Sequence, residues 1–140
     1  MLNADLIALR ETLLGIGGDL LEASLRPTGA AMARDGSVAL MNAPLENQHA
    51  FEMLCDLLHG KARNHEIRAS GILMDVRFSP PDGTGRVDAL LCVLEHEHGE
   101  GFMVHQVYRR NAEGRVVFQR QYTEPVPEMK VFVGRALAAS

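Results

Sequence analysis

Apolar and polar residues alternate most clearly between Gly71 and Thr123. Every second residue from Ile72 to Phe78 is apolar, and the charged Asp75 and Arg77 lie between them. A period of two predicts a strand with one buried face and one solvated face. Turn residues separate this strand from three further segments with strand-like composition, so the region predicts a four-stranded antiparallel meander. The three further strands are expected at Arg86–Glu95, Phe102–Arg110 and Arg115–Thr123.

The segment Arg86–Glu95 differs from its neighbours because apolar residues occupy both its odd-numbered and its even-numbered positions. Val87 and Leu91 would line one face, while Leu90 and Leu94 would line the other. A strand that is apolar on both faces is usually covered on both faces. Either a helix of this chain or a second subunit must supply the second cover. Because only two helices are predicted for a broad sheet, we expect a homodimer.

A helix, a hairpin and a second helix are predicted before the meander. Apolar residues recur at steps of three and four from Leu2 to Leu20, which is typical of an amphipathic helix. Glycines at 15, 17 and 18 predict a break or bend there, with a second helical piece from Asp19 to Leu25. A short hairpin over Thr28–Met41 turns at an Asp-Gly pair.

The second helix is expected to carry its apolar stripe from Phe51 to Leu58, with Glu46 and Gln48 on its polar face. It is expected to end at Gly60, unless Lys61-Ala62-Arg63 extend it. The tail from Glu128 to Ser140 is expected to form a short strand or helix through Val131 and Phe132. Together these elements predict a single α+β domain over residues 1–140. Its architecture is a helix–hairpin–helix unit followed by a four-stranded antiparallel meander, with the helices packed on the sheet.

Composition narrows the class of partner and the compartment. The chain has 140 residues, of which 46% are hydrophobic and 23% charged, and its formal net charge is −4. Binding to nucleic acid or to anionic membranes generally requires a basic face, for which an acidic chain is a poor candidate, so we expect neither partner. We find no signal peptide and no apolar run of membrane-spanning length. Cys55 and Cys92 are expected to be buried, reduced thiols, and the protein is expected in the cytoplasm.

A histidine-rich hairpin is one candidate for chemistry. If Gly99-Glu100 forms a two-residue turn, Leu94 faces His105 across the hairpin. The side chains of His96, His98 and His105 would then project from one side, where three imidazoles could hold zinc. A turn of different length shifts the register and sends His105 to the other face, leaving a solvated hairpin tip. Zinc is the one cofactor considered, and otherwise none is expected.

A row of charged residues on the predicted strands is the second candidate. It consists of Asp75, Arg77, Asp88, Arg109 and Arg110. Arginine bonds a carboxylate or a phosphate in two places, so the row could bind a small anionic ligand. The alternative is a set of cross-strand ion pairs on a wet sheet face.

No sequence motif fixes a reaction, since neither G-x-S-x-G nor H-E-x-x-H occurs. We therefore predict a small cytoplasmic binding or regulatory module that self-associates and takes a protein or a small anionic ligand. The alternative is a metal- or anion-dependent enzyme that uses the sheet face around Asp75, Arg77, His96 and His105.

About forty residues of the meander resemble a family of small uncharacterised bacterial proteins. The segments that carry the resemblance are Asp75-Val76-Arg77, Pro80-Pro81, Asp88-Ala89, Glu95-His96 and Tyr108-Arg109-Arg110. Because that family has no established activity, the resemblance implies a compact α+β domain and no particular function.

Overall fold

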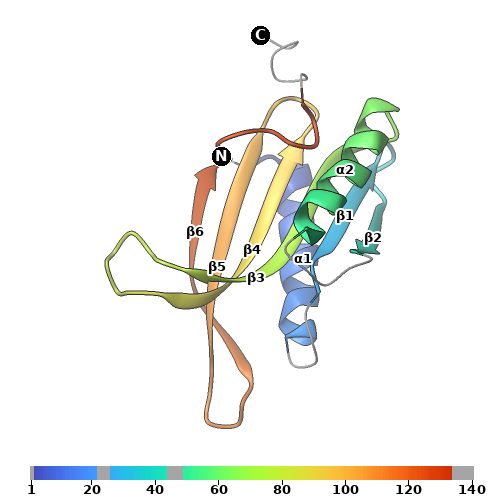
Figure 1. Cartoon of the computed structure of the whole chain (residues 1–140). Helices are drawn as coiled ribbons and strands as arrows, with labels where there is room; N and C mark the ends of the chain where they lie inside the picture. Colours follow the sequence, from blue (N-terminus) through green and yellow to red (C-terminus); the bar gives the residue numbers. More distant parts are fainter. Residues whose placement is uncertain (1, 22–25, 44–48, 134–140) are drawn as a thin grey trace.

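The computed structural model describes residues 2–21, 26–43 and 49–133, and it forms two helices and one six-stranded antiparallel sheet (Figure 1). Strand order across the sheet is β2-β1-β3-β4-β5-β6. The predicted α+β class, the hairpin between the helices and the four-stranded meander β3–β6 are confirmed. The elements are α1 (Ala4–Leu20), β1 (Thr28–Ala33), β2 (Val38–Asn42), α2 (Ala50–Arg63), β3 (Ile67–Phe78), β4 (Val87–His96), β5 (Gly101–Arg110) and β6 (Val116–Pro125).

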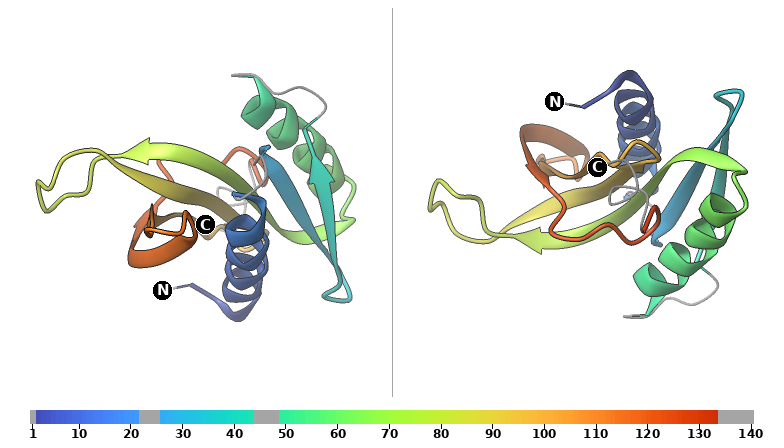
Figure 2. Two further views of the ribbon diagram at one scale, coloured as in Figure 1. Left: turned by 90° about the horizontal axis from the view of Figure 1, so that it is seen from below. Right: turned by 90° about the horizontal axis from the view of Figure 1, so that it is seen from above.

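The two helices lie on opposite faces of the sheet, and each covers its own core (Figure 2). Helix α1 packs chiefly on β3 and β4, where Leu6, Leu9 and Leu13 are fully buried. Helix α2 packs on β1 and β3, with Leu54 and Leu58 fully buried. The face that carries α1 is called the α1 face below, and the other is called the α2 face.

The predicted break in the first helix is wrong, because α1 continues through the glycines to Leu20. One of the three, Gly17, has a packing role: a Cβ atom there would lie 2.8 Å from the side chain of Leu90 and 3.2 Å from that of Leu73. Glycine lets the helix approach the sheet closely, and packing outweighs the propensity cost of about 1 kcal/mol. Residues 22–25 of the expected second helical piece lie outside the described residues.

As far as residue 133, the tail packs on the sheet without forming the expected strand or helix. Residues 126–133, called the C-terminal segment below, cross the α2 face as irregular chain (Figure 1). Val131 and Phe132 are nevertheless almost fully buried in the core beneath α2. Residues 134–140 lie outside the described residues, as do Glu46 and Gln48 of the predicted polar helix face.

Three hairpins share one turn geometry, and this geometry corrects the predicted register of the histidine-rich hairpin. Gly36, Gly99 and Gly114 each have a positive φ and occupy the third position of a three-residue loop. The two-residue turn expected at Gly99-Glu100 is therefore wrong. In the observed register His105 faces Leu91 rather than Leu94. A shift by an odd number of residues moves a side chain to the opposite face of the sheet.

Both cysteines are free and buried, as predicted. Burial raises the pKa of each thiol to about 12, so neither is a reactive thiolate near neutral pH. Over the part of the chain that the structure describes, neither helix has the length and apolar character needed to cross a bilayer.

Candidate functional site

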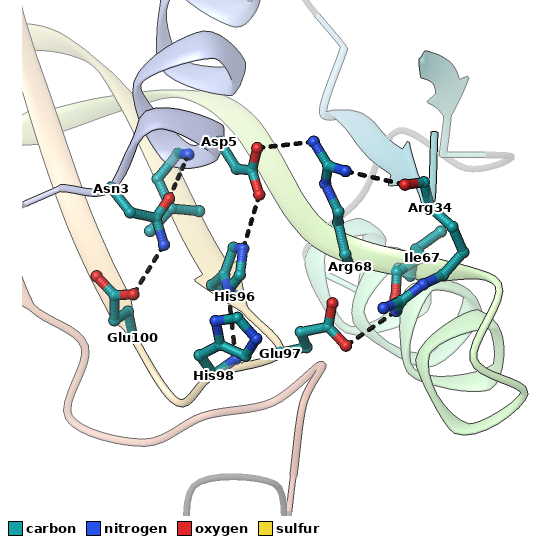
Figure 3. Close-up of polar contacts among 10 residues, drawn as sticks. Asn3, Asp5, Arg34, Ile67, Arg68, His96, Glu97, His98 and Glu100 are labelled. Carbon is teal, nitrogen blue, oxygen red and sulfur yellow. Dashed lines mark hydrogen bonds and ion pairs between the residues drawn. The ribbon is translucent and has the colours of Figure 1, made fainter. Parts of the chain in front are cut away.

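The structure does not bring the three histidines of the proposed zinc site together. His96 projects from the α1 face and His105 from the α2 face, because their positions in β4 and β5 have opposite orientations in the observed register. His96 is also occupied (Figure 3). Its Nε2 bonds Oδ2 of Asp5 at 2.9 Å, and its Nδ1 accepts the backbone N–H of His98 at 3.2 Å. With both ring nitrogens engaged, His96 has none left for a metal ion.

His96 belongs instead to a polar cluster that fastens the start of α1 to the sheet (Figure 3). The other carboxylate oxygen of Asp5 bonds Nη2 of Arg68 at 2.9 Å, and Nη1 of Arg68 donates to the backbone oxygen of Arg34. Arg34 in turn pairs with Glu97 at 2.9 Å. The hydrogen bond from His96 and the pairing with Arg68 lower the pKa of Asp5, although burial opposes them. The cluster joins α1, β3 and the β4–β5 turn, so we assign it a structural role.

Four residues of the charged row make separate contacts within the fold. Asp75 accepts the hydroxyl of Tyr108 at 2.8 Å, and Arg77 lies 3.5 Å from Asp88. Both side chains of the latter pair are more than half exposed, so the pair contributes little to stability. Arg110 donates to the backbone oxygen of Leu21, just beyond the end of α1.

The fifth residue of the row, Arg109, does not share a face with the others. It neighbours Tyr108, whose hydroxyl lies on the α1 face, so strand alternation directs Arg109 to the α2 face.

The residues expected to form the alternative enzyme site are far apart. Asp88, beside Arg77, lies eight residues before His96 in the same strand, a separation of roughly 26 Å. His105 lies on the opposite face, so these groups do not form one reaction centre.

The α2 face carries a hollow that the sequence analysis did not locate. Helix α2 covers only the half of the sheet near β1 and β3, and the C-terminal segment crosses one end of the rest (Figure 2). Between them lies a surface cavity of about 500 Å³, called the sheet hollow below. Its walls come from α2, three strands and the C-terminal segment. The lining residues are Phe51, Met74, Leu91, Val93, Glu95, Met103, Val126, Pro127, Glu128 and Lys130.

Glu95 is the polar residue that builds one wall of the sheet hollow. Its side chain is 2% exposed, and its carboxylate accepts backbone N–H groups from Lys130, Val131 and Phe132 at 2.9 to 3.1 Å. A ring nitrogen of His59 on α2 also bonds the backbone oxygen of Val131. A buried carboxylate satisfied by successive backbone N–H groups is a strong anchor. Glu95 thus holds the C-terminal segment against the sheet.

Beyond the sheet hollow, the same face carries an aromatic cluster. The ring of His105 stacks on Phe78 with 3.9 Å between centroids, and Tyr122 lies against Phe78. Burial lowers the pKa of His105, although Glu124 acts in the opposite direction. The β3–β4 loop folds over β6, where Asp82 bonds both Tyr122 and Arg120. These contacts fix one flank of the open face.

Within the described residues, no group of three or more His, Cys, Asp or Glu side chains is arranged to hold a metal ion. Searches of family models, curated proteins and solved structures gave no match to this chain.

Sequence reasoning missed Glu95 and the sheet hollow. A signal for Glu95 was present in the sequence. Leu91, Val93 and Glu95 are alternate residues and lie on the same face of the strand, so Glu95 places a carboxylate in a row of apolar side chains. The hollow had no such signal, because it depends on where α2 stops and where the C-terminal segment crosses.

Proposed function

We propose that this protein is a small cytoplasmic binding module that takes an apolar segment of a partner protein in the sheet hollow. The observation that carries the proposal is the hollow itself. Met74, Leu91 and Met103 from three adjacent strands form an apolar floor that stays partly exposed. Soluble proteins use such concave apolar surfaces chiefly for binding.

The polar groups around the hollow favour a protein segment over a small polar ligand. Small-molecule sites combine apolar walls with a few polar groups that orient the ligand. Here the carboxylate of Glu95 is already occupied by the backbone of residues 130–132. The charges of Glu128 and Lys130 lie at the exposed rim of the hollow. An apolar floor with a charged rim matches the general anatomy of protein interfaces.

The residues of the floor also suit an adaptable binding surface. Met74 and Met103 are unbranched and have polarisable thioethers, so they repack around side chains of different shape. Methionine-lined surfaces are typical of proteins that accept several partner sequences. An adaptor or a chaperone-like module would require this property.

The experiment is a selection from a random peptide display library on the folded protein, followed by affinity measurements with the enriched peptides. We expect enrichment of peptides with two or more large apolar residues. Met103→Glu should weaken their binding at least tenfold, a change of about 1.4 kcal/mol or more, because it places a charge on the apolar floor.

Phe118→Glu is the matched control, since Phe118 is 41% exposed and lies on the α1 face, paired with Tyr108. Binding should be unchanged in this variant. The proposal is rejected if no peptide is enriched, or if Met103→Glu and Phe118→Glu affect binding equally while both variants stay folded.

A further inference from the structure

Strand β2 is one edge of the sheet, and within residues 2–21, 26–43 and 49–133 no strand pairs with its outer side. Val38 and Leu40 are 37% and 49% exposed on the α1 face. Ala39 and Met41 point to the α2 face, where a groove of about 590 Å³ separates them from Leu57 and Lys61 of α2. The strand has no proline and no charged residue. Natural sheets usually protect an exposed edge with such residues, because an open edge pairs readily with another strand.

The other edge of the same sheet is protected. Strand β6 carries Arg120 and Glu124, ends at Pro125, and has an irregular register with β5 between Gln106 and Tyr108. The amide of Gln106 bonds the backbone oxygens of Gln119 and Arg120 at this irregularity. The contrast between the two edges indicates that β2 is kept open for pairing.

We propose that two copies of this chain dimerise by antiparallel pairing of β2 with β2, which joins the two six-stranded sheets into one. The homodimer was expected from the two-sided apolar strand at 86–95. The structure changes its location. Helix α1 covers one face of that strand, and on the other face Glu95 lies under the C-terminal segment while Leu91 lines the sheet hollow, for which a partner segment is proposed. The interface lies at β2 and is independent of the sheet hollow.

The backbone of β2 selects one register for this pairing. The backbone N–H of Ala33 donates to the backbone oxygen of Ser37, and the backbone N–H of Ala43 donates to that of Pro27. Every second residue of an antiparallel strand bonds to the same neighbour, so the odd-numbered residues of β2 bond to β1. The N–H and C=O groups of Val38, Leu40 and Asn42 therefore point outward. A two-fold axis at Leu40 pairs Leu40 with its own copy and Val38 with Asn42 of the second copy. All three outward residues are then bonded in both directions.

The side chains are self-complementary in this register. Leu40 meets the second copy's Leu40 on the α1 face, and Ala39 meets the second copy's Met41 beside the α2 groove. No charge opposes a like charge, since residues 36–43 carry none. The β2 edge exposes apolar side chains on both faces of the sheet, so the strand that pairs with it should also be apolar on both faces. A second copy of β2 meets this requirement. A symmetric contact of this kind closes as a dimer.

The interface is short, so the dimer should be weak. Five paired residues span only about 17 Å of strand, and contacts of this size fall at the low end of specific interfaces. We expect the measured mass to rise from one chain of 15.3 kDa to two as the concentration rises from micromolar to near-millimolar.

Sedimentation equilibrium of the wild type and two variants tests the proposal. Leu40→Lys places two like charges at the axis and should give a monomer at every concentration. Phe118→Lys makes the same type of change on β6 and should dimerise like the wild type. A wild type that stays monomeric at the highest concentration overturns the proposal, because β2 must then serve another partner. A Leu40→Lys protein that still dimerises also overturns it.

Oxidative cross-linking tests the register separately. Paired residues with mutual hydrogen bonds have Cα atoms about 5.5 Å apart, within disulfide range, so Leu40→Cys should cross-link to its own copy. Val38→Cys is the control, since it would lie roughly 13 Å from its own copy. Cys55 and Cys92 are buried and should not react. Equal cross-linking of the two variants would contradict the register.

Discussion

Folding moves the ring of His105 from water into a largely buried site. It is 9% exposed, stacks on Phe78, and has a buried Nδ1 that bonds no group in the described part of the chain. Burial lowers its pKa below the ordinary value of 6.5. Above that value the ring is neutral in both the folded and the unfolded chain, so the full stability is present. As the pH falls from 6.5 through the folded pKa, the unfolded chain binds a proton that the folded chain does not, and stability is lost.

We therefore predict that the free energy of unfolding is lower at pH 5.5 than at pH 7.5, and that His105→Phe reduces this difference. Phenylalanine keeps the stacking on Phe78 and removes both the titration and the unsatisfied nitrogen. Urea denaturation of both proteins at the two pH values measures the effect. Identical pH dependence in the two proteins would show that folding does not lower the pKa of His105.

At the same scale, single residues also mark where sequence reasoning stops. The pairing of Asp5 with both His96 and Arg68 joins positions more than sixty residues apart, and nothing in local spacing announces it. The face of His105, in contrast, was within reach. Gly36 and Gly114 occupy the third position of three-residue loops, and treating Gly99 in the same way would have given the observed register.

The elements themselves were well predicted, because each rests on a local pattern. Alternation gave the strands of the meander, and the Asp-Gly pair gave the first hairpin. The break in α1 was wrong because Gly17 is chosen for contact with Leu73 and Leu90, a tertiary cause that helix propensity cannot reveal. The C-terminal segment was misassigned for a similar reason. Its conformation depends on Glu95, which lies about 35 residues earlier in the chain.

We predict that Glu95→Gln loosens the C-terminal segment while leaving the rest of the sheet folded. The amide keeps one oxygen that can accept from Val131 and Phe132, but its NH₂ group faces the backbone N–H of Lys130, and the negative charge that strengthens all of these bonds is lost. Stability should fall by roughly 1.5–3 kcal/mol. Amide hydrogen exchange should become faster at Lys130, Val131 and Phe132.

Glu128→Gln provides the comparison, because it makes the same chemical change at an exposed position of the same segment. Exchange at residues 130–132 should be unaffected in that variant. If both variants behave like the wild type, Glu95 does not hold the segment.

At the scale of the whole molecule, the sequence predicted the layers but not the surface they leave. The order of elements sufficed for α+β with helices packed on an antiparallel sheet. The open edge at β2 follows from its place at the end of the strand order, and the sheet hollow follows from where α2 lies and where residues 126–133 cross the sheet. The proposed function depends on these two surfaces rather than on the charged and histidine-bearing positions that the sequence singled out.

The most direct test of the proposed function is methionine-methyl NMR of the protein during titration with a peptide from the display selection. Met74 and Met103 line the sheet hollow, whereas Met32 is buried on the α1 face. We predict that the Met74 and Met103 methyl signals shift progressively and saturate together, while the Met32 signal stays in place. Shifts absent from Met74 and Met103, or equally large at Met32, would contradict binding in the sheet hollow.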